Sequence, residues 1–257
     1  MPGRRILSLW FPRMAAERVQ RLRADVLPVP LAVVGDRNGA QELVSLSVEA
    51  SAAGLVRGQA LRDATAICPA LLTAAEDPLN EARFLGALRR WAGRLSPWVS
   101  EEPPDSLLVD LTGSAHLFGG EEAVLAKVAE DCAELGLTVR AGIADTPGAA
   151  WGLARYARMQ AAPLRSGDAI DQEARATRSR AAKRRGWERG GGLPRPVAAK
   201  GADSAVIAPP GRLVEALSDL PLAALRLEQD VVDRLLRLGL RRVGDLIVLP
   251  RAGLARR

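Results

Sequence analysis

The sequence predicts a mixed fold of strands and helices, of α+β or α/β class, on three observations. Compact apolar runs typical of strands lie at residues 5–11, 31–34 and 106–111. Between such runs lie stretches in which apolar residues recur at helical spacing. Hydrophobic residues make up 48% of the 257 residues, which is enough for a sizeable core.

Proline and acidic residues mark the beginnings and ends of the expected helices and strands. Pro12 ends the first strand and suits the first turn of a helix. Asp77 and Pro78 begin a longer helix with one apolar face, and Trp91 and Trp98 are expected in the core. The expected strands are residues 5–11, 31–34, 43–46, 98–100, 106–111 and 137–143. The expected helices are residues 14–22, 48–53, 61–67, 78–95, 121–135, 147–156, 213–217, 230–238 and 243–249.

The strand at residues 106–111 is apolar on both faces, which predicts an interior position under helices. Before it, Glu101 and Glu102 are most simply a solvated turn. Asp105 is expected to cap the turn that precedes the strand, with a residual metal ligand as the alternative. Asp110 has the opposite parity to Asp105 on a regular strand, so the two make a poor carboxylate pair.

The positive charge of the chain is concentrated in one segment. Residues 171–200 carry nine basic and three acidic residues, so their net charge of +6 equals that of the whole chain. No apolar run approaches the roughly 20 residues that span a bilayer, and the basic start is interpreted as a buried strand rather than a secretory signal. Cys68 and Cys132 are expected to be reduced thiols, which fits a cytoplasmic protein without a membrane partner.

Residues 158–204 lack sustained periodicity and are predicted to be a flexible basic linker. Three interpretations stay open for its charge: a solvated linker, a segment that follows the DNA backbone, or a docking segment for a protein partner. The candidate nucleic-acid contacts are Arg180, Lys183, Arg184 and Arg185. Short stretches of helical periodicity in residues 205–257 predict a small module of short helices, of helix–hairpin–helix type.

Several motifs, in order along the chain, resemble those of Y-family (translesion) DNA polymerases. They are ILSLWF at residues 6–11, SVEASAAGLVRG at 47–58, ATAICP at 64–69, the segments 105–113 and 142–155, and LGLRRVGDL at 238–246. The resemblance implies an α+β fold: a ferredoxin-like βαββαβ palm over residues 1–157, small fingers inserted at about 30–75, and a partial thumb over 205–257.

The chain departs from the family pattern where the family holds two divalent cations. Trp10 stands in place of the first metal-binding Asp, and Pro12 in place of the next acid. Asp105 is kept, but Ser106 replaces the Glu that follows it in the family. One carboxylate does not hold two hard cations, so no metal and no catalytic residue are predicted.

The family's triphosphate contacts are also replaced. Val48 and Ser51 stand where the family has a Tyr and an Arg, and Trp151 stands where it has a Lys. These side chains cannot replace charge-assisted contacts to phosphate. We expect Trp10 and Trp151 to pack together and to fill the space of the former active site.

This pattern resembles the ImuB family, whose members are non-catalytic. The resemblance implies a DNA-engaging scaffold in a bacterial, damage-induced (SOS) response that carries out error-prone translesion synthesis and repair. It implies as partners DNA, an error-prone replicative-type polymerase, a RecA-like accessory protein and the sliding clamp, and a nucleoid-associated location in the cytoplasm. The alternatives are an active translesion polymerase with a degenerate Mg²⁺ site and a protein-interaction domain without a role on DNA.

Overall fold

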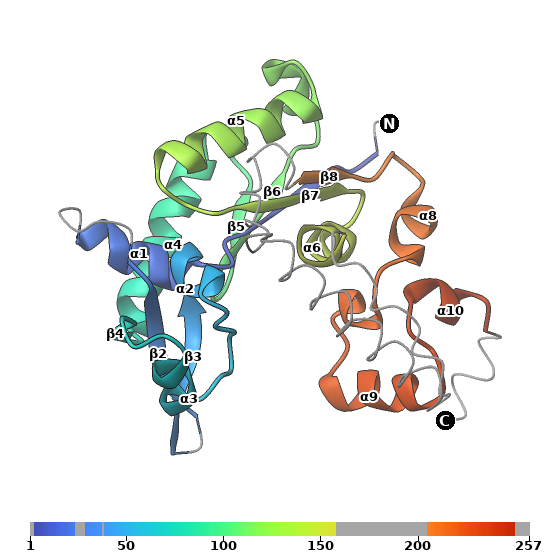
Figure 1. Ribbon diagram of the computed structural model, residues 1–257. Helices are drawn as coiled ribbons and strands as arrows, with labels where there is room; N and C mark the ends of the chain where they lie inside the picture. The colour runs from blue at the N-terminus through green and yellow to red at the C-terminus, as the bar shows by residue number, and fades with distance from the viewer. Residues whose placement is uncertain (1–2, 24–28, 38, 158–204, 250–257) are drawn as a thin grey trace, which may run out of the picture. The chain divides into compact units, whose positions relative to one another are not determined.

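The computed structural model describes residues 3–23, 29–37, 39–157 and 205–249 (Figure 1). The predicted linker, with its candidate contacts Arg180, Lys183, Arg184 and Arg185, lies outside the described residues and stays a prediction. Among the described helices, none is long and apolar enough to cross a membrane. The division of the chain into palm, fingers, linker and thumb likewise stays a prediction.

A five-stranded sheet with the order β5-β6-β1-β7-β8 organises the larger part of the fold. Its strands are β1 (Ile6–Trp10), β5 (Val99–Glu102), β6 (Ser106–Asp110), β7 (Arg140–Ala144) and β8 (Ala205–Ile207). Neighbouring strands are antiparallel, except that β8 runs parallel to β7. With α4 (Pro78–Ala92) before β5 and α5 (Glu121–Glu134) between β6 and β7, the order β5-β6-β1-β7 is the ferredoxin-like βαββαβ arrangement. The predicted fold class is therefore confirmed.

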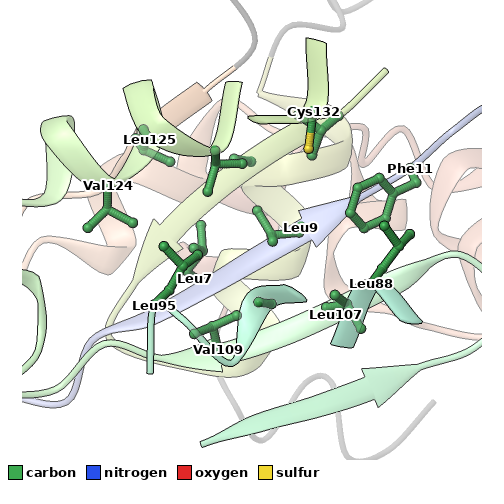
Figure 2. Close-up of a cluster of buried hydrophobic side chains, with 14 of the residues drawn as sticks. Leu7, Leu9, Phe11, Leu88, Leu95, Leu107, Val109, Val124, Leu125 and Cys132 are labelled. Atoms are coloured by element: carbon green, nitrogen blue, oxygen red, sulfur yellow. The ribbon is translucent and has the colours of Figure 1, made fainter. Parts of the chain in front are cut away.

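One face of this sheet is covered by α4 and α5. Side chains alternate along a strand, so Leu7 and Leu9 of β1 point to the same face as Leu107 and Val109 of β6. Figure 2 shows these residues in one buried cluster with side chains from both helices. The residues that α4 and α5 contribute to that cluster are Leu85, Leu88, Ala92, Val124, Leu125, Val128 and Cys132. The interior position predicted for strand 106–111 is confirmed, because β6 is paired on both sides.

The opposite face is covered by α6 (Pro147–Tyr156) (Figure 1). Thr146 caps this helix by accepting a hydrogen bond from the Ala149 amide, as the Thr-Pro sequence predicts. The helix lies directly on β7, because Gly142 has no side chain to hold it away. A Cβ at Gly142 would lie only 2.5 Å from the carbonyl oxygen of Ala150 and 2.6 Å from the amide nitrogen of Ala154.

Residues 31–75 form a second, three-stranded sheet with the order β3-β2-β4. The strands are β2 (Leu31–Arg37), β3 (Ala40–Leu46) and β4 (Leu72–Ala75), and the nearby helices are α1 (Met14–Leu22), α2 (Val48–Ala52) and α3 (Leu61–Ile67). The predicted hairpin and short helices are confirmed, and Ser47 caps α2. The sequence did not predict β4, which is short and carries no alternation of apolar and polar residues.

The C-terminal elements are α8 (Leu213–Ser218), the 3-10 turn η3 (Leu222–Leu225), α9 (Gln229–Arg237) and α10 (Val243–Ile247). The three predicted helices are confirmed, and Gly239 adopts a positive φ of 83° between α9 and α10. The strand β8 and the turn η3 were not predicted. Leu220, Ala224 and Val243 share a buried cluster with α6.

Two expectations about the region around β5 are wrong. Glu101 and Glu102 are not a solvated turn but the end of β5, where Glu101 pairs with Arg89 and Glu102 pairs with Arg226. Trp98 is not in the core, since 75% of it is exposed. Both errors arise because β5 is an edge strand, which tolerates acids and exposed rings that an interior strand excludes.

A buried acid on α1 makes stability depend on pH. Glu17 accepts hydrogen bonds from the Thr138 amide (2.9 Å) and hydroxyl (2.5 Å), and burial raises the pKa of its carboxyl above 4.5. Between pH 4.5 and the raised pKa of the folded state, the folded state holds a proton that the unfolded state has lost. The contribution of Glu17 to stability therefore falls as pH rises from 4.5 through the raised pKa. We expect the free energy of unfolding of the wild type, relative to Glu17→Gln, to fall with rising pH in urea titrations. Glu122→Gln, at an exposed site, should show no such trend.

Candidate functional site

Three strands place a row of side chains on the face that α6 covers. Trp10 of β1 is the direct neighbour of Ser106 on β6 and of Arg140 on β7. All three have the parity of Ile6, which packs against α6, rather than that of Leu7. The register thus gathers an indole, a hydroxyl and a guanidinium at one end of the sheet.

Helix α6 adds Trp151 and Arg155, which are four residues apart and therefore share one face of the helix. The Cζ atom of Arg155 lies 4.3 Å from the ring centroid of Trp151 and 5.1 Å from that of Trp10. Only 13% of the Arg155 side chain is exposed. The guanidinium is thus held between two indole rings, at distances where cation–π attraction is significant.

Both oxygens of the Asp105 carboxylate already have partners. Trp10 Nε1 donates a hydrogen bond of 3.0 Å to Oδ2, and the Ser106 hydroxyl lies 3.2 Å from Oδ1. Arg155 Nη2 donates to the Ser106 hydroxyl at 2.6 Å and lies 3.5 Å from Asp105 Oδ1. Asp105 lies in the turn before β6, but its carboxylate contacts the Trp10 indole, the Ser106 hydroxyl and the Arg155 guanidinium rather than a backbone amide of the turn, so the predicted role as a turn cap needs correction.

These residues do not fit the divalent cations of a polymerase palm. Such cations need several hard oxygen ligands with open coordination positions. In the described residues no group of three His, Cys, Asp or Glu side chains could hold a metal ion. Ser106 and Trp10 supply no second carboxylate beside Asp105.

The charge at the centre of the site is permanent at neutral pH. Burial lowers the pKa of Arg155 to about 10, while the nearby Asp105 carboxylate opposes that shift. At pH 7 the guanidinium is still protonated, because its pKa lies well above that pH. The site therefore carries a fixed internal cation beside the Asp105 carboxylate.

The contact between Arg155 and the two indoles extends in both directions. Arg226, which ends η3, lies 4.9 Å from the Trp151 ring centroid and pairs with Glu102 at 2.7 Å. The Cζ atom of Arg140 lies 5.4 Å from the ring centroid of Trp10. We call this set the guanidinium–indole stack. It comprises, in order, Arg226, Trp151, Arg155, Trp10 and Arg140.

The two candidate positions in the predicted fingers lie in α2, Val48 at its first residue and Ser51 at its fourth. Ser51 accepts a 2.7 Å hydrogen bond from Arg13 Nη1, which also donates to the carbonyl oxygens of Leu46 and Ser47. Burial lowers the pKa of Arg13. Val48 is 54% exposed. Ser51 is thus engaged within the protein, and Val48 offers only an apolar surface to solvent.

A groove of about 300 Å³ runs beside Asp105. One wall comes from the end of β1 and the start of α1, and the other comes from β2, β3 and the turn before α3. Its charged lining residues are Arg37, Glu42, Arg57, Glu76, Glu81 and Asp105. The groove therefore presents both signs of charge, and Arg37 and Glu76 neutralise each other in a two-point pair.

The structure brings together Trp10, Asp105, Ser106 and Trp151 from the predicted set. The expectation that Trp10 and Trp151 pack on each other needs correction, because the Arg155 guanidinium lies between their rings. The aromatic partner of Trp151 is instead Tyr156, with the two ring centroids 6.0 Å apart. Sequence reasoning missed the three arginines of the stack. The i, i+4 spacing of Trp151 and Arg155 was the one available signal.

Comparison with known proteins shows the family to which this chain belongs. Residues 9–155 match the model of the impB/mucB/samB family, so the chain belongs to that family, which has the Y-family polymerase fold. Among solved structures, the chain is similar to an insertion ternary complex of Dbh DNA polymerase (TM-score 0.67) and to DinB from Sulfolobus solfataricus (TM-score 0.64). Both are 15% identical and cover 98% of this chain and 62% of theirs, which shows the fold.

Among curated proteins, the chain is similar to Protein ImuB from two strains of Caulobacter vibrioides, NA1000 / CB15N and ATCC 19089 / CIP 103742 / CB 15. Identity is 39% over 204 residues, which covers 79% of this chain. The chain spans about a third (35%) of the length of these relatives.

Proposed function

We propose that this chain is a non-catalytic member of its family that engages primer–template DNA in damage-induced, error-prone synthesis without extending the primer. The observation that carries the proposal is the state of Asp105. Its carboxylate is hydrogen-bonded to the Trp10 indole and faces the Arg155 guanidinium, so it is not free to bind a cation. Similarity to ImuB and to polymerases of the Dbh and DinB type supports a role on DNA.

The partners of this activity follow from the family resemblance. We propose DNA, an error-prone replicative-type polymerase, a RecA-like accessory protein and the sliding clamp. The work would take place on the nucleoid in the cytoplasm, as part of the SOS response. No cofactor is proposed.

The first test is primer extension with Mg²⁺ or Mn²⁺ at an excess of protein over primer–template. We expect no extended product, because the chain lacks the carboxylates that hold two cations. The control is Asp105→Ala. Metal-dependent extension by the wild type that is lost in Asp105→Ala would support an active polymerase instead.

The second test is the salt dependence of DNA binding, measured by fluorescence anisotropy with the full chain. Each phosphate that a protein neutralises contributes about −0.9 to the slope of log K against log salt on duplex DNA. We expect a measurable slope, and a shallower one when Arg180, Lys183, Arg184 and Arg185 are replaced by alanine. An unchanged slope would contradict the assignment of these four residues. No salt-dependent binding at all would favour a protein-interaction domain.

A further inference from the structure

The most unusual feature of the candidate site is that the Asp105 carboxylate is matched by a cation from the protein itself. We propose that the Arg155 guanidinium takes the place of the divalent cations of a polymerase palm, so that this chain binds primer–template DNA with an affinity independent of divalent metal. The inference rests on the proposed function and adds a regulatory property to it.

A metal ion would have to compete with groups of the protein for the Asp105 carboxylate. An incoming cation would have to displace the 3.0 Å hydrogen bond from Trp10 Nε1 and the Arg155 guanidinium, 3.5 Å from Asp105. In the described part of the chain no group of three acidic, His or Cys side chains could offer a metal more ligands, and the neighbouring Ser106 hydroxyl is already bonded to Arg155. The internal cation is therefore preferred over a metal from solution.

Arg155 has little freedom to move away. Its guanidinium lies between the rings of Trp151 and Trp10, and its helix is seated on Gly142 of β7. Swinging the side chain out would separate a cation from two indoles and from its acid at once. The guanidinium is thus a constant part of the site and not an occasional occupant.

The same guanidinium affects the approach of DNA. In an acidic palm, metal ions neutralise the carboxylates that would otherwise repel the phosphates of the primer end. Here Arg155 neutralises Asp105, and Arg140 adds a second guanidinium, 5.4 Å from the ring centroid of Trp10. The site is therefore ready to accept a phosphate before any metal arrives.

The test compares DNA affinity of the full chain in EDTA and in MgCl₂ at matched ionic strength, by fluorescence anisotropy. We expect the two Kd values to agree within about twofold. Binding that strengthens about tenfold or more in Mg²⁺ would overturn the inference while leaving the proposed function intact.

Variants assign the effect to Arg155. In Arg155→Met we expect binding about fivefold stronger in Mg²⁺ than in EDTA, since an uncompensated carboxylate then repels a phosphate. Arg155→Lys keeps the charge and should remain independent of metal. The matched control is Arg94→Met, in the turn after α4, because Arg94 also lies over an indole, Trp91, and pairs with Asp131. If Arg155→Met does not fold, as judged by circular dichroism, the wild type and Arg155→Lys still decide the outcome.

A second readout does not depend on DNA. Free Mn²⁺ is measured by electron paramagnetic resonance while the wild-type chain is added. We expect no saturable binding, whereas a bound Mn²⁺ that is lost in Asp105→Asn would overturn the inference. If the chain binds no DNA in either buffer, the proposed function fails, and this measurement alone judges whether Arg155 excludes a metal.

Discussion

Replacing Arg5 by alanine is expected to lower the free energy of unfolding by about 3 kcal/mol. Arg5 is 8% exposed and donates hydrogen bonds of 2.6 and 2.7 Å to Glu121, one of 2.6 Å to Asp145, and one of 2.8 Å to the carbonyl of Ala208. These bonds join the start of β1 to α5, to the loop after β7 and to the residue after β8. Hydrogen bonding to Glu121 is the largest cause of the raised pKa of Arg5.

The loss of stability arises because removing the Arg5 guanidinium leaves the charges of Glu121 and Asp145 without a partner. The Glu121 and Asp145 side chains are only about one-fifth exposed (21% and 20%), so their charges are poorly solvated without Arg5. The pKa of Asp145 is lowered from 3.8, first by the Gly211 amide and then by Arg5. The contribution of this pair is therefore present above pH 3.8 and is lost as pH falls through the lowered value.

Urea titration at neutral pH measures the effect. Arg4→Ala is the matched control, because Arg4 pairs with Asp110 but its side chain is 63% exposed. An exposed pair contributes little, so we expect a change below about 1 kcal/mol there. Equal losses in Arg4→Ala and Arg5→Ala would show that the buried ion pairs do not stabilise the fold.

Gly142→Ala is expected to cost about 3 kcal/mol, as an overpacked contact between β7 and α6. The added methyl group would meet the Ala150 carbonyl at 2.5 Å and the Ala154 amide at 2.6 Å. These are backbone atoms that cannot rotate away, so the helix itself has to move. A shift of α6 also moves Trp151 and Arg155 and thus disturbs the guanidinium–indole stack.

Thermal and urea unfolding measure the stability of this variant, and tryptophan fluorescence reports on the stack. Gly148→Ala is the control within the same helix, since a Cβ there meets nothing within 4 Å. Alanine favours helix over glycine by up to about 1 kcal/mol, so Gly148→Ala should be neutral or stabilising. A Gly142→Ala protein as stable as the wild type would show that α6 is not seated on β7 as described.

Much of the fold was predictable because its signals are local. The helix at 61–67 was predicted with its observed bounds, and Thr146-Pro147 identified the start of α6. The strands β4 and β8 were not predictable, because their residues, LTAA and AVI, form strands only by pairing with β2 and β7. Distant partners, and not local pattern, determine such short strands.

The residues of the site were predictable only at positions where the family motifs have a known site residue. Trp10, Ser106 and Trp151 were identified as replacements by their places in those motifs, whereas Arg155 was not. A charged residue on a helix is usually solvent-exposed, and nothing local indicates that this one is buried between two rings. Glu102 was misjudged for a similar reason, since its partner Arg226 is 124 positions away.

The guanidinium–indole stack also constrains how this sequence can change over evolutionary time. An acid restored at position 10 would stand beside Arg140 and near Arg155, and we expect it to form ion pairs with them rather than a metal site. Losing Arg155 first would instead leave Asp105 without its cation. Each single step towards catalysis therefore meets a barrier, and several substitutions would have to occur together.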